Sequence, residues 1–220
     1  MSEVNHNSKL IIGITGVKHS GKNTVANYLV KKYGFIKRNL SEPLKTVCRS
    51  LFNFSNEQVD GEEKDIPDID WFGLTPRETM QFMTTDLRKH MKKLKPEFGE
   101  NIFIRNFDQW YKIQTNNYVV IPDVTFQNEV DYIRSKNGII LKILYHSTPN
   151  EVSLMDKIFS FFGINTESEP SIGYDISINN EHEHNITDLY AQIEKIMLDK
   201  FDLHRKVSML ENKNYEFFGN

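Results

Sequence analysis

A lysine and two glycines near the N-terminus have the types and spacing of a phosphate-binding loop. The stretch GVKHSGKNT places Gly16 and Gly21 around a short loop, and Lys22 follows the second glycine directly. Glycines let a backbone curl until several N–H groups point at one anion, and a following helix adds the positive end of its dipole. A lysine at this place neutralises the β- and γ-phosphates of a nucleoside triphosphate. The spacing therefore predicts a Walker A loop that binds ATP; the alternative is a glycine turn with a solvated lysine.

The residues beside this loop favour a small-molecule kinase over a switch GTPase. Asn23 stands where such loops usually have serine or threonine, and Thr24 follows it. We expect the Thr24 hydroxyl to lie near Mg²⁺. Asp123 ends the apolar run VVIP, and open α/β sheets build their sites at the carboxyl ends of strands. Asp123 is therefore a candidate ligand of Mg²⁺ or of the substrate, with a loop or helix-capping aspartate as the alternative.

A kinase must also bind an acceptor, and one arginine is a candidate for that role. Arg77 lies in the first turn of a predicted helix, where a cation opposes the helix dipole, so a bound anion would explain it. Gln81, Thr84, Thr85 and Arg88 continue the same side and form a polar strip able to meet a phosphate and a base edge. Most other cationic side chains are expected to be solvated surface charges. Further candidates to bind the anionic acceptor are Lys18, His19, Arg38, Lys45, Lys64 and Arg105.

The elements that position these residues predict an α/β fold. Short runs rich in β-branched and other apolar residues predict strands at 10–15, 35–40, 118–123, 139–145 and 175–180, of which 10–15 carries no charge. Helical spacing predicts helices at 23–32, 41–52, 75–94, 128–138 and 185–201, with an acidic surface segment at 55–73. Strands that alternate with helices imply a five-stranded parallel sheet with helices on both faces. We expect one apolar stripe of the 75–94 helix to be core: Met80, Met83, Leu87, Met91 and Leu94.

Length and composition set the class of protein. The chain has 220 residues, 39% hydrophobic and 26% charged, with a net charge of −3. This balance predicts a single domain over 1–220, with a core of about 9–202 and an extension at 203–220. The charge gives no overall attraction to nucleic acid or to anionic membranes. Without a signal peptide or a long apolar run, we expect a cytoplasmic protein, a monomer or a homodimer.

Several motifs occur together in the order of one family. The stretches GVKHSGKNTVANYL, LSEPLK, TPRETMQFMTTD, ENIFIRNF and IPDVTFQNEV resemble those of viral and bacteriophage deoxynucleoside monophosphate kinases. The resemblance covers roughly 9–200. It implies a P-loop NTPase fold of the nucleoside monophosphate kinase type. It also implies transfer of the γ-phosphoryl group of ATP to a deoxynucleoside 5′-monophosphate, with Mg²⁺, and a host-cytoplasmic location for a virus-encoded enzyme.

The resemblance assigns residues to the two substrates. By this resemblance, the residues at the family's ATP-binding positions are Lys18, Gly21, Lys22, Asn23 and Thr24, with His19 where a relative has arginine. The residues at its acceptor-binding positions are Arg77, Gln81, Thr84, Thr85, Asp123 and Glu129, with Lys64 matched loosely. Phe103 falls where relatives have a tryptophan, and either ring could stack on a base.

Three departures from the family pattern bear on base selectivity. Relatives often read Asp-x-Arg after the third strand, but here Thr125 takes the place of that arginine. A Gly-Thr-Asp turn becomes Thr84-Thr85-Asp86, and Thr166 stands in place of a histidine. Arg88, Arg105 or Arg134 could replace the missing cation.

Two other functions are alternatives to a deoxynucleoside monophosphate kinase. One is another small-molecule P-loop kinase, such as one acting on phosphomevalonate, and the other is a nucleotide-binding protein without catalysis.

Overall fold

The computed structural model describes residues 9–17, 19–115, 118–145, 172–180 and 186–201. The chain divides into two compact units. The first unit comprises 1–38 and 115–220, and the second comprises 39–114. The single kinase domain expected over 1–220 stays a prediction. No helix in the described ranges is both long enough and apolar enough to span a bilayer.

The first unit is built on a five-stranded sheet. Its strands are β1 Leu10–Thr15, β2 Ile36–Lys37, β3 Tyr118–Ile121, β4 Ile139–Leu144 and β5 Ile176–Asn179. Their order is β2-β3-β1-β4-β5, and every neighbouring pair is parallel. The predicted parallel sheet is confirmed, although β2 is shorter than the predicted 35–40. The first strand lies in the centre, so the loop that follows it emerges in the middle of the carboxyl edge.

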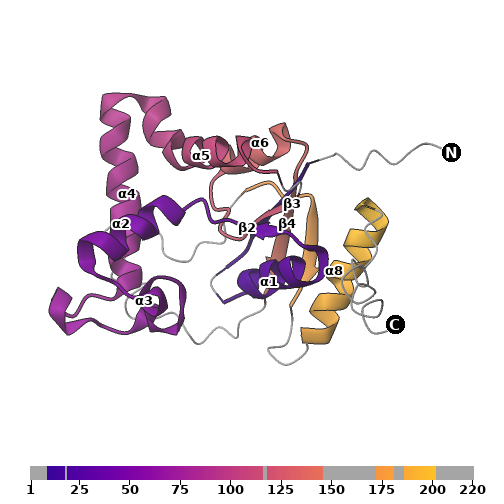
Figure 1. The fold of residues 1–220 in the computed structure, drawn as a ribbon, viewed down its shortest axis with the longest axis horizontal. Helices are drawn as coiled ribbons and strands as arrows, with labels where there is room; N and C mark the ends of the chain where they lie inside the picture. The colour runs from indigo at the N-terminus through magenta and orange to yellow at the C-terminus, as the bar shows by residue number, and fades with distance from the viewer. Residues whose placement is uncertain (1–8, 18, 116–117, 146–171, 181–185, 202–220) are drawn as a thin grey trace, which may run out of the picture. The chain divides into compact units, whose positions relative to one another are not determined.

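Helices cover both faces of this sheet, as predicted. Helices α1 Lys22–Tyr33 and α8 Ile186–Phe201 pack on one face, where alternate residues of β1 such as Ile12 and Ile14 join one apolar cluster with them. Helix α6 Gln127–Ser135 packs on the other face, against β1 and β4. Figure 1 shows α1 and α8 side by side in front of the strands. The strand order and the glycine loop after β1 identify the P-loop NTPase fold.

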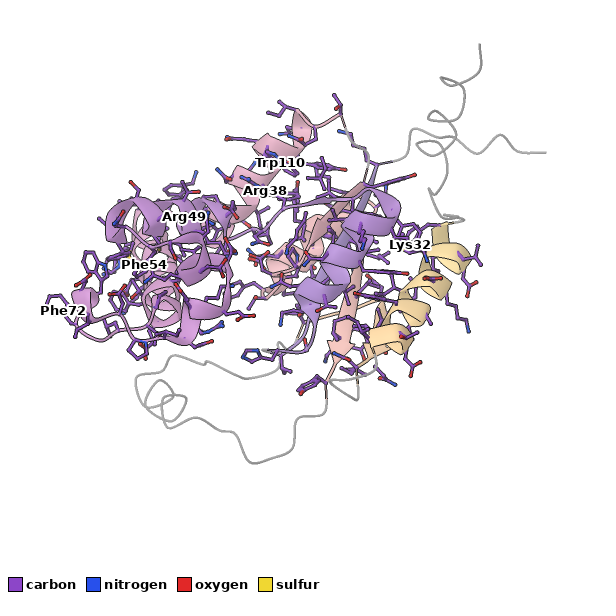
Figure 2. All side chains as sticks on the ribbon, turned by 60° about the horizontal axis from the view of Figure 1, so that its bottom comes forward. Lys32, Arg38, Arg49, Phe54, Phe72 and Trp110 are labelled. Carbon is purple, nitrogen blue, oxygen red and sulfur yellow. The ribbon has the colours of Figure 1, made fainter. Side chains whose placement is uncertain are left out.

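A polar and aromatic contact fixes α1 against α8. The rings of Tyr28 and Tyr190 stack with centroids 3.9 Å apart. The hydroxyl of Tyr28 donates to the carboxylate of Glu194, which also pairs with Lys32. Figure 2 shows Lys32 on the side of α1 that faces α8. Burial, together with the hydrogen bond to Glu194, raises the pKa of Tyr28. This contact holds the helix that follows the loop.

The second unit is helical. Its elements are α2 Glu42–Phe52, α3 Asn56–Asp60, α4 Pro76–Leu94, α5 Pro96–Lys112 and two 3₁₀ turns at Glu62–Asp65 and Ile69–Trp71. The predicted start of α4 is confirmed by a capping box, in which Thr75 Oγ1 accepts from Glu78 N and Glu78 Oε2 accepts from Thr75 N at 2.7 Å. The predicted surface segment 55–73 contains α3 and both 3₁₀ turns.

The expected apolar core of α4 is wrong in part. Met80, Met83, Leu87 and Met91 are half-buried, and Leu94 is 77% exposed. Leu94 is the last residue of α4, and the chain turns into α5 directly after it. The second unit has no sheet against which such a stripe could be fully covered. Its buried apolar side chains come instead from other helices, such as Cys48 of α2 and Val59 of α3, both 0% exposed, and Phe107 of α5, 1% exposed. The sequence analysis did not predict α5.

Candidate functional site

The loop between β1 and α1 has a backbone that requires glycine at two places. Gly16 has a φ of 146° and Gly21 a φ of 97°, and His19 between them also has a positive φ of 60°. A Cβ on Gly16 would lie 2.6 Å from the carbonyl oxygen of Ile143. Substitution of either glycine would therefore strain the loop. The loop curls tightly at the carboxyl edge of the sheet, as the spacing predicted.

Lys22 lies folded over this loop. Its Nζ donates to the carbonyl oxygen of Gly16 at 2.8 Å and also to that of Val17. The N-terminus of α1 has no side-chain cap and no acidic residue in its first turn. Helices α3 and α4 begin instead with capping boxes. An anion at the start of α1 would therefore meet a positive dipole end, backbone N–H groups and the ammonium of Lys22.

Two buried hydroxyls beside the loop suit a polar ligand. Thr15 ends β1 and is 1% exposed, and Ser20 within the loop is fully buried. Neither hydroxyl has a hydrogen-bond partner among the described residues. A buried polar group without a partner costs free energy, on the order of 1–3 kcal/mol. A phosphate oxygen is one group that would satisfy such a hydroxyl.

Asp123 lies at the same edge of the sheet. Strand β3 pairs with β1 in a register that matches Ile121 with Gly13, and Asp123 follows in the turn after β3. The backbone N–H of Val124 donates to the carbonyl oxygen of Ile14 at 3.2 Å. This bond holds the Asp123 turn against the end of β1, from which the loop starts. Thr24 lies in the first turn of α1. Within the described ranges, we find no group of three or more His, Cys, Asp or Glu side chains that could hold a metal ion.

Glu129, expected on the acceptor side, caps a helix in this structure. Its Oε2 accepts from the backbone N–H groups of Thr125 at 2.9 Å and Phe126 at 3.1 Å. The side chain is 2% exposed. It holds the turn that follows Asp123 and begins α6. Lys18 and Thr166, both named in the sequence analysis, lie outside the described residues.

In the second unit, Arg77 pairs with the carboxylate of Asp65 through two hydrogen bonds. Its Nε donates to Asp65 Oδ1 at 2.7 Å and its Nη2 to Asp65 Oδ2 at 3.1 Å. This two-point geometry is the one a guanidinium offers to a carboxylate or to a phosphate. Gln81 is half-buried one turn further along α4. The start of α4 is thus a place where an anion is bound.

Lys64 is next to Asp65 in the chain, and its charge also acts on the carboxylate of Asp60. Burial alone would raise the pKa of Asp60, but the hydrogen bond and charge of Lys45 outweigh burial and lower this pKa. The charge of Lys64 acts in the same direction. Lys64 therefore belongs to a group of cations around Asp60.

The remaining acceptor candidates lie further along α4. Arg88 covers the ring of Phe103 on α5 with its guanidinium 4.8 Å from the ring centroid, and its Nη1 donates to the carbonyl oxygen of Glu100. Phe103 is 3% exposed, so stacking on a base would require Arg88 to move. Arg88 is three turns beyond Arg77, about 16 Å along the helix axis. Thr84 Oγ1 donates back to the carbonyl oxygen of Met80, and Thr85 is exposed.

Arg134 lies at the wrong edge of the sheet to replace the missing arginine. Its Nη2 pairs with Asp175 Oδ1 at 2.8 Å, and Asp175 Oδ2 accepts from the backbone N–H of Ile140. Both partners lie where β4 and β5 begin. The loop and Asp123 are at the ends of their strands. Arg105 is exposed on α5 of the second unit.

The sequence analysis missed one residue at the loop. Asn180 follows β5 directly, and its Nδ2 donates to the carbonyl oxygen of Ser20 at 2.9 Å. The available signal was its position, because it ends a predicted strand as Asp123 does. Nothing local in the sequence pairs it with a residue 160 positions earlier.

Comparison with known proteins gives a family. A family model described as "Deoxynucleotide monophosphate kinase" matches residues 9–93. A protein of Acanthamoeba polyphaga mimivirus, described as "Putative deoxynucleotide monophosphate kinase", is 43% identical over 141 residues, which cover 61% of this chain and 73% of that protein.

Solved structures are also similar to the chain. TT1252 from Thermus thermophilus has a TM-score of 0.47 and 14% identity, covering 88% of this chain and 99% of that one. Shikimate kinase from Aquifex aeolicus vf5 has a TM-score of 0.37 and 17% identity, covering 86% and 99%. Both TM-scores are low, so the fold assignment rests on the strand order and the loop.

Proposed function

Because the chain belongs to the deoxynucleotide monophosphate kinase family, as its motifs predicted, we propose that it transfers the γ-phosphoryl group of ATP to a deoxynucleoside 5′-monophosphate. The products would be ADP and a deoxynucleoside diphosphate. The observation that carries the proposal is the uncapped start of α1. This helix start follows the glycine loop, whose Gly16 carbonyl accepts from the ammonium of Lys22, at the sheet edge where Asp123 lies.

The donor is proposed to bind in the first unit. Backbone N–H groups of the loop and of Asn23 would hold the phosphates, since they lie at the positive end of α1. Lys22 would leave the carbonyl oxygens of Gly16 and Val17 to neutralise charge on the β- and γ-phosphates. The buried hydroxyl of Ser20 supports this assignment because it lacks a partner within the described chain.

Magnesium fits the oxygen donors at this edge. Thr24 and Asp123 would hold it, together with phosphate oxygens, because Mg²⁺ prefers few protein ligands and hard oxygen atoms. When bound, the ion would neutralise charge on the phosphates. This chain's own contribution is to hold Asp123 in place, through the bond from Val124 N to Ile14 O and the cap of Glu129 on α6.

The acceptor phosphate is proposed to bind Arg77. The carboxylate of Asp65 now makes the two-point contact that a phosphate would make. Arg77 lies in the first turn of α4, where the helix dipole also favours an anion. Gln81, about 6 Å further along α4, would then lie nearer the sugar and base. Its amide can donate and accept, which suits a base edge.

A coupled assay of ADP release tests this proposal. The protein would be given ATP, Mg²⁺ and each common nucleoside or deoxynucleoside monophosphate in turn. We expect deoxynucleoside monophosphates to accelerate ADP release, with a preference among the bases that Gln81→Ala reduces. If none accelerates ADP release and phosphomevalonate does, the chain is a different small-molecule kinase.

Asp65 gives a further test of the acceptor site. Since its carboxylate competes with the monophosphate for Arg77, Asp65→Asn should lower KM for the monophosphate about two- to fivefold, in line with the small free energy of an exposed ion pair. KM for ATP should not change. Added salt should reduce the difference between the variant and the wild type, because it screens the exposed pair. Glu63→Gln, which neutralises an exposed carboxylate in the same 3₁₀ turn, is the matched control. An equal fall in KM for both variants would show a general effect of charge.

A further inference from the structure

Asn180 joins the ends of β4 and β5 to the phosphate loop. It comes directly after β5, and its backbone N–H donates to the carbonyl oxygen of Leu144 at the end of β4. Its side-chain Nδ2 donates to the carbonyl oxygen of Ser20, in the loop after β1, at 2.9 Å. A Cβ on Gly21 would lie 2.9 Å from the same Nδ2. The amide of Asn180 is thus packed closely against the peptide unit between Ser20 and Gly21.

This hydrogen bond fixes the direction of a loop N–H group. A peptide unit is planar and trans, so its N–H and C=O groups point to opposite sides. Because Asn180 holds the Ser20 carbonyl toward its own amide, the N–H of Gly21, which lies in the same plane, points in the opposite direction, away from that amide. A glycine with a φ of 97° has no Cβ to restrict the rotation of this unit, so an external contact is needed to hold it.

We propose that Asn180 is a positioning residue for the phosphates of the donor nucleotide. It acts through the peptide unit of Ser20 and Gly21, whose N–H it aims before the nucleotide binds, and it makes no contact with the reacting atoms. The inference rests on the proposed function, since the loop must bind the phosphates of ATP. Preorganised N–H groups bind an anion more tightly because their orientation is fixed before binding.

The number of phosphates on the ligand separates this role from two others. Substitution of a residue that positions the loop weakens the binding of ATP and ADP but not of adenosine. Substitution of a residue that contacts the base weakens the binding of adenosine as well. Substitution of a residue that only supports the fold lowers the melting temperature and weakens the binding of all three ligands.

The test is direct titration of the full chain with ATP, ADP and adenosine, for the wild type, Asn180→Ala and Asn180→Asp. Asn180→Ala should weaken ATP and ADP binding about tenfold, the loss expected for one partly buried hydrogen bond, and leave adenosine binding unchanged. Asn180→Asp keeps the shape but cannot donate to Ser20 O, and its charge repels phosphate, so it should weaken ATP more than Asn180→Ala does. In turnover, KM should rise for ATP and not for the monophosphate.

Asn179→Ala is the matched control, because this neighbouring side chain is exposed. Melting temperatures are measured alongside, and the titrations are run well below the lowest of them. An Asn180→Ala protein that binds ATP like the wild type, or that loses adenosine as strongly as ATP, would overturn the inference while the proposed function stands. Failure of the wild type to bind ATP would instead overturn the proposed function.

Discussion

Lys22→Ala is expected to lower kcat about 100- to 1,000-fold and to leave the melting temperature unchanged. The ammonium would stabilise the charge that spreads over the transferring phosphoryl group, and alanine cannot do so. In this structure the half-buried Lys22 donates from its Nζ to the loop carbonyls of Gly16 and Val17, and it does not belong to the apolar core cluster. Removing it should therefore affect catalysis and not stability.

Steady-state kinetics and thermal melting on the same preparation test this expectation. Lys31→Ala is the control, because Lys31 lies on the same helix α1, is exposed and is also a lysine. It should turn over at the wild-type rate. A Lys22→Ala enzyme with near wild-type kcat would show that the loop does not hold the transferring phosphate.

Arg77→Ala is expected to raise KM for the deoxynucleoside monophosphate about 10- to 100-fold and to leave KM for ATP nearly unchanged. The guanidinium would make two charge-assisted hydrogen bonds to the 5′-phosphate in place of those it makes to Asp65. Removal of the cation leaves that phosphate with the helix N-terminus alone. Some loss of kcat should follow, because the acceptor is then held less firmly in line.

Two controls separate this effect from a change in the second unit as a whole. Lys89→Ala removes an exposed cation from the same helix α4 and should leave both KM values unchanged. Arg77→Lys keeps the charge but not the two-point geometry, so its KM should lie between those of the wild type and Arg77→Ala. An equal rise in KM for both substrates would remove Arg77 from the acceptor site.

The donor side could be predicted from sequence because its signals are local. The loop, Lys22 and Thr24 lie within one stretch, between an uncharged strand and an amphipathic helix, and both elements form as predicted. Asp123 was predictable for a similar reason, since parallel strands bring their carboxyl ends to one edge. The capping box of α4 is also local, and its Thr-x-x-Glu pattern fixed the start of that helix.

Features that depend on tertiary contacts could not be predicted in this way. The pairing of Asn180 with Ser20 and of Asp65 with Arg77 joins residues that no local pattern relates. The family resemblance placed Glu129 on the acceptor side, and the sequence analysis did not predict that its Oε2 accepts from two backbone N–H groups. The burial of the Met stripe also depended on which elements cover α4.

Helix α5 is a different kind of omission, because its sequence does carry a signal. Pro96 lies in its first turn, and Phe103, Phe107 and Tyr111 recur four residues apart, with each side chain buried. Gly99 lowers helix propensity in this segment. In the structure a Cβ there would lie 2.5 Å from the carbonyl oxygen of Arg88, so the glycine permits the close approach of α4 and α5.

Transfer of a labelled γ-phosphoryl group is the most direct test of the central claim. The wild type would be incubated with γ-labelled ATP, Mg²⁺ and each deoxynucleoside monophosphate, and the labelled products would be separated. We predict that the label appears at the β-phosphate of a deoxynucleoside diphosphate, in an amount equal to the ADP formed, and that Lys22→Ala slows its appearance about 100- to 1,000-fold. Label found only in inorganic phosphate, or remaining in ATP with every deoxynucleoside monophosphate, would contradict it.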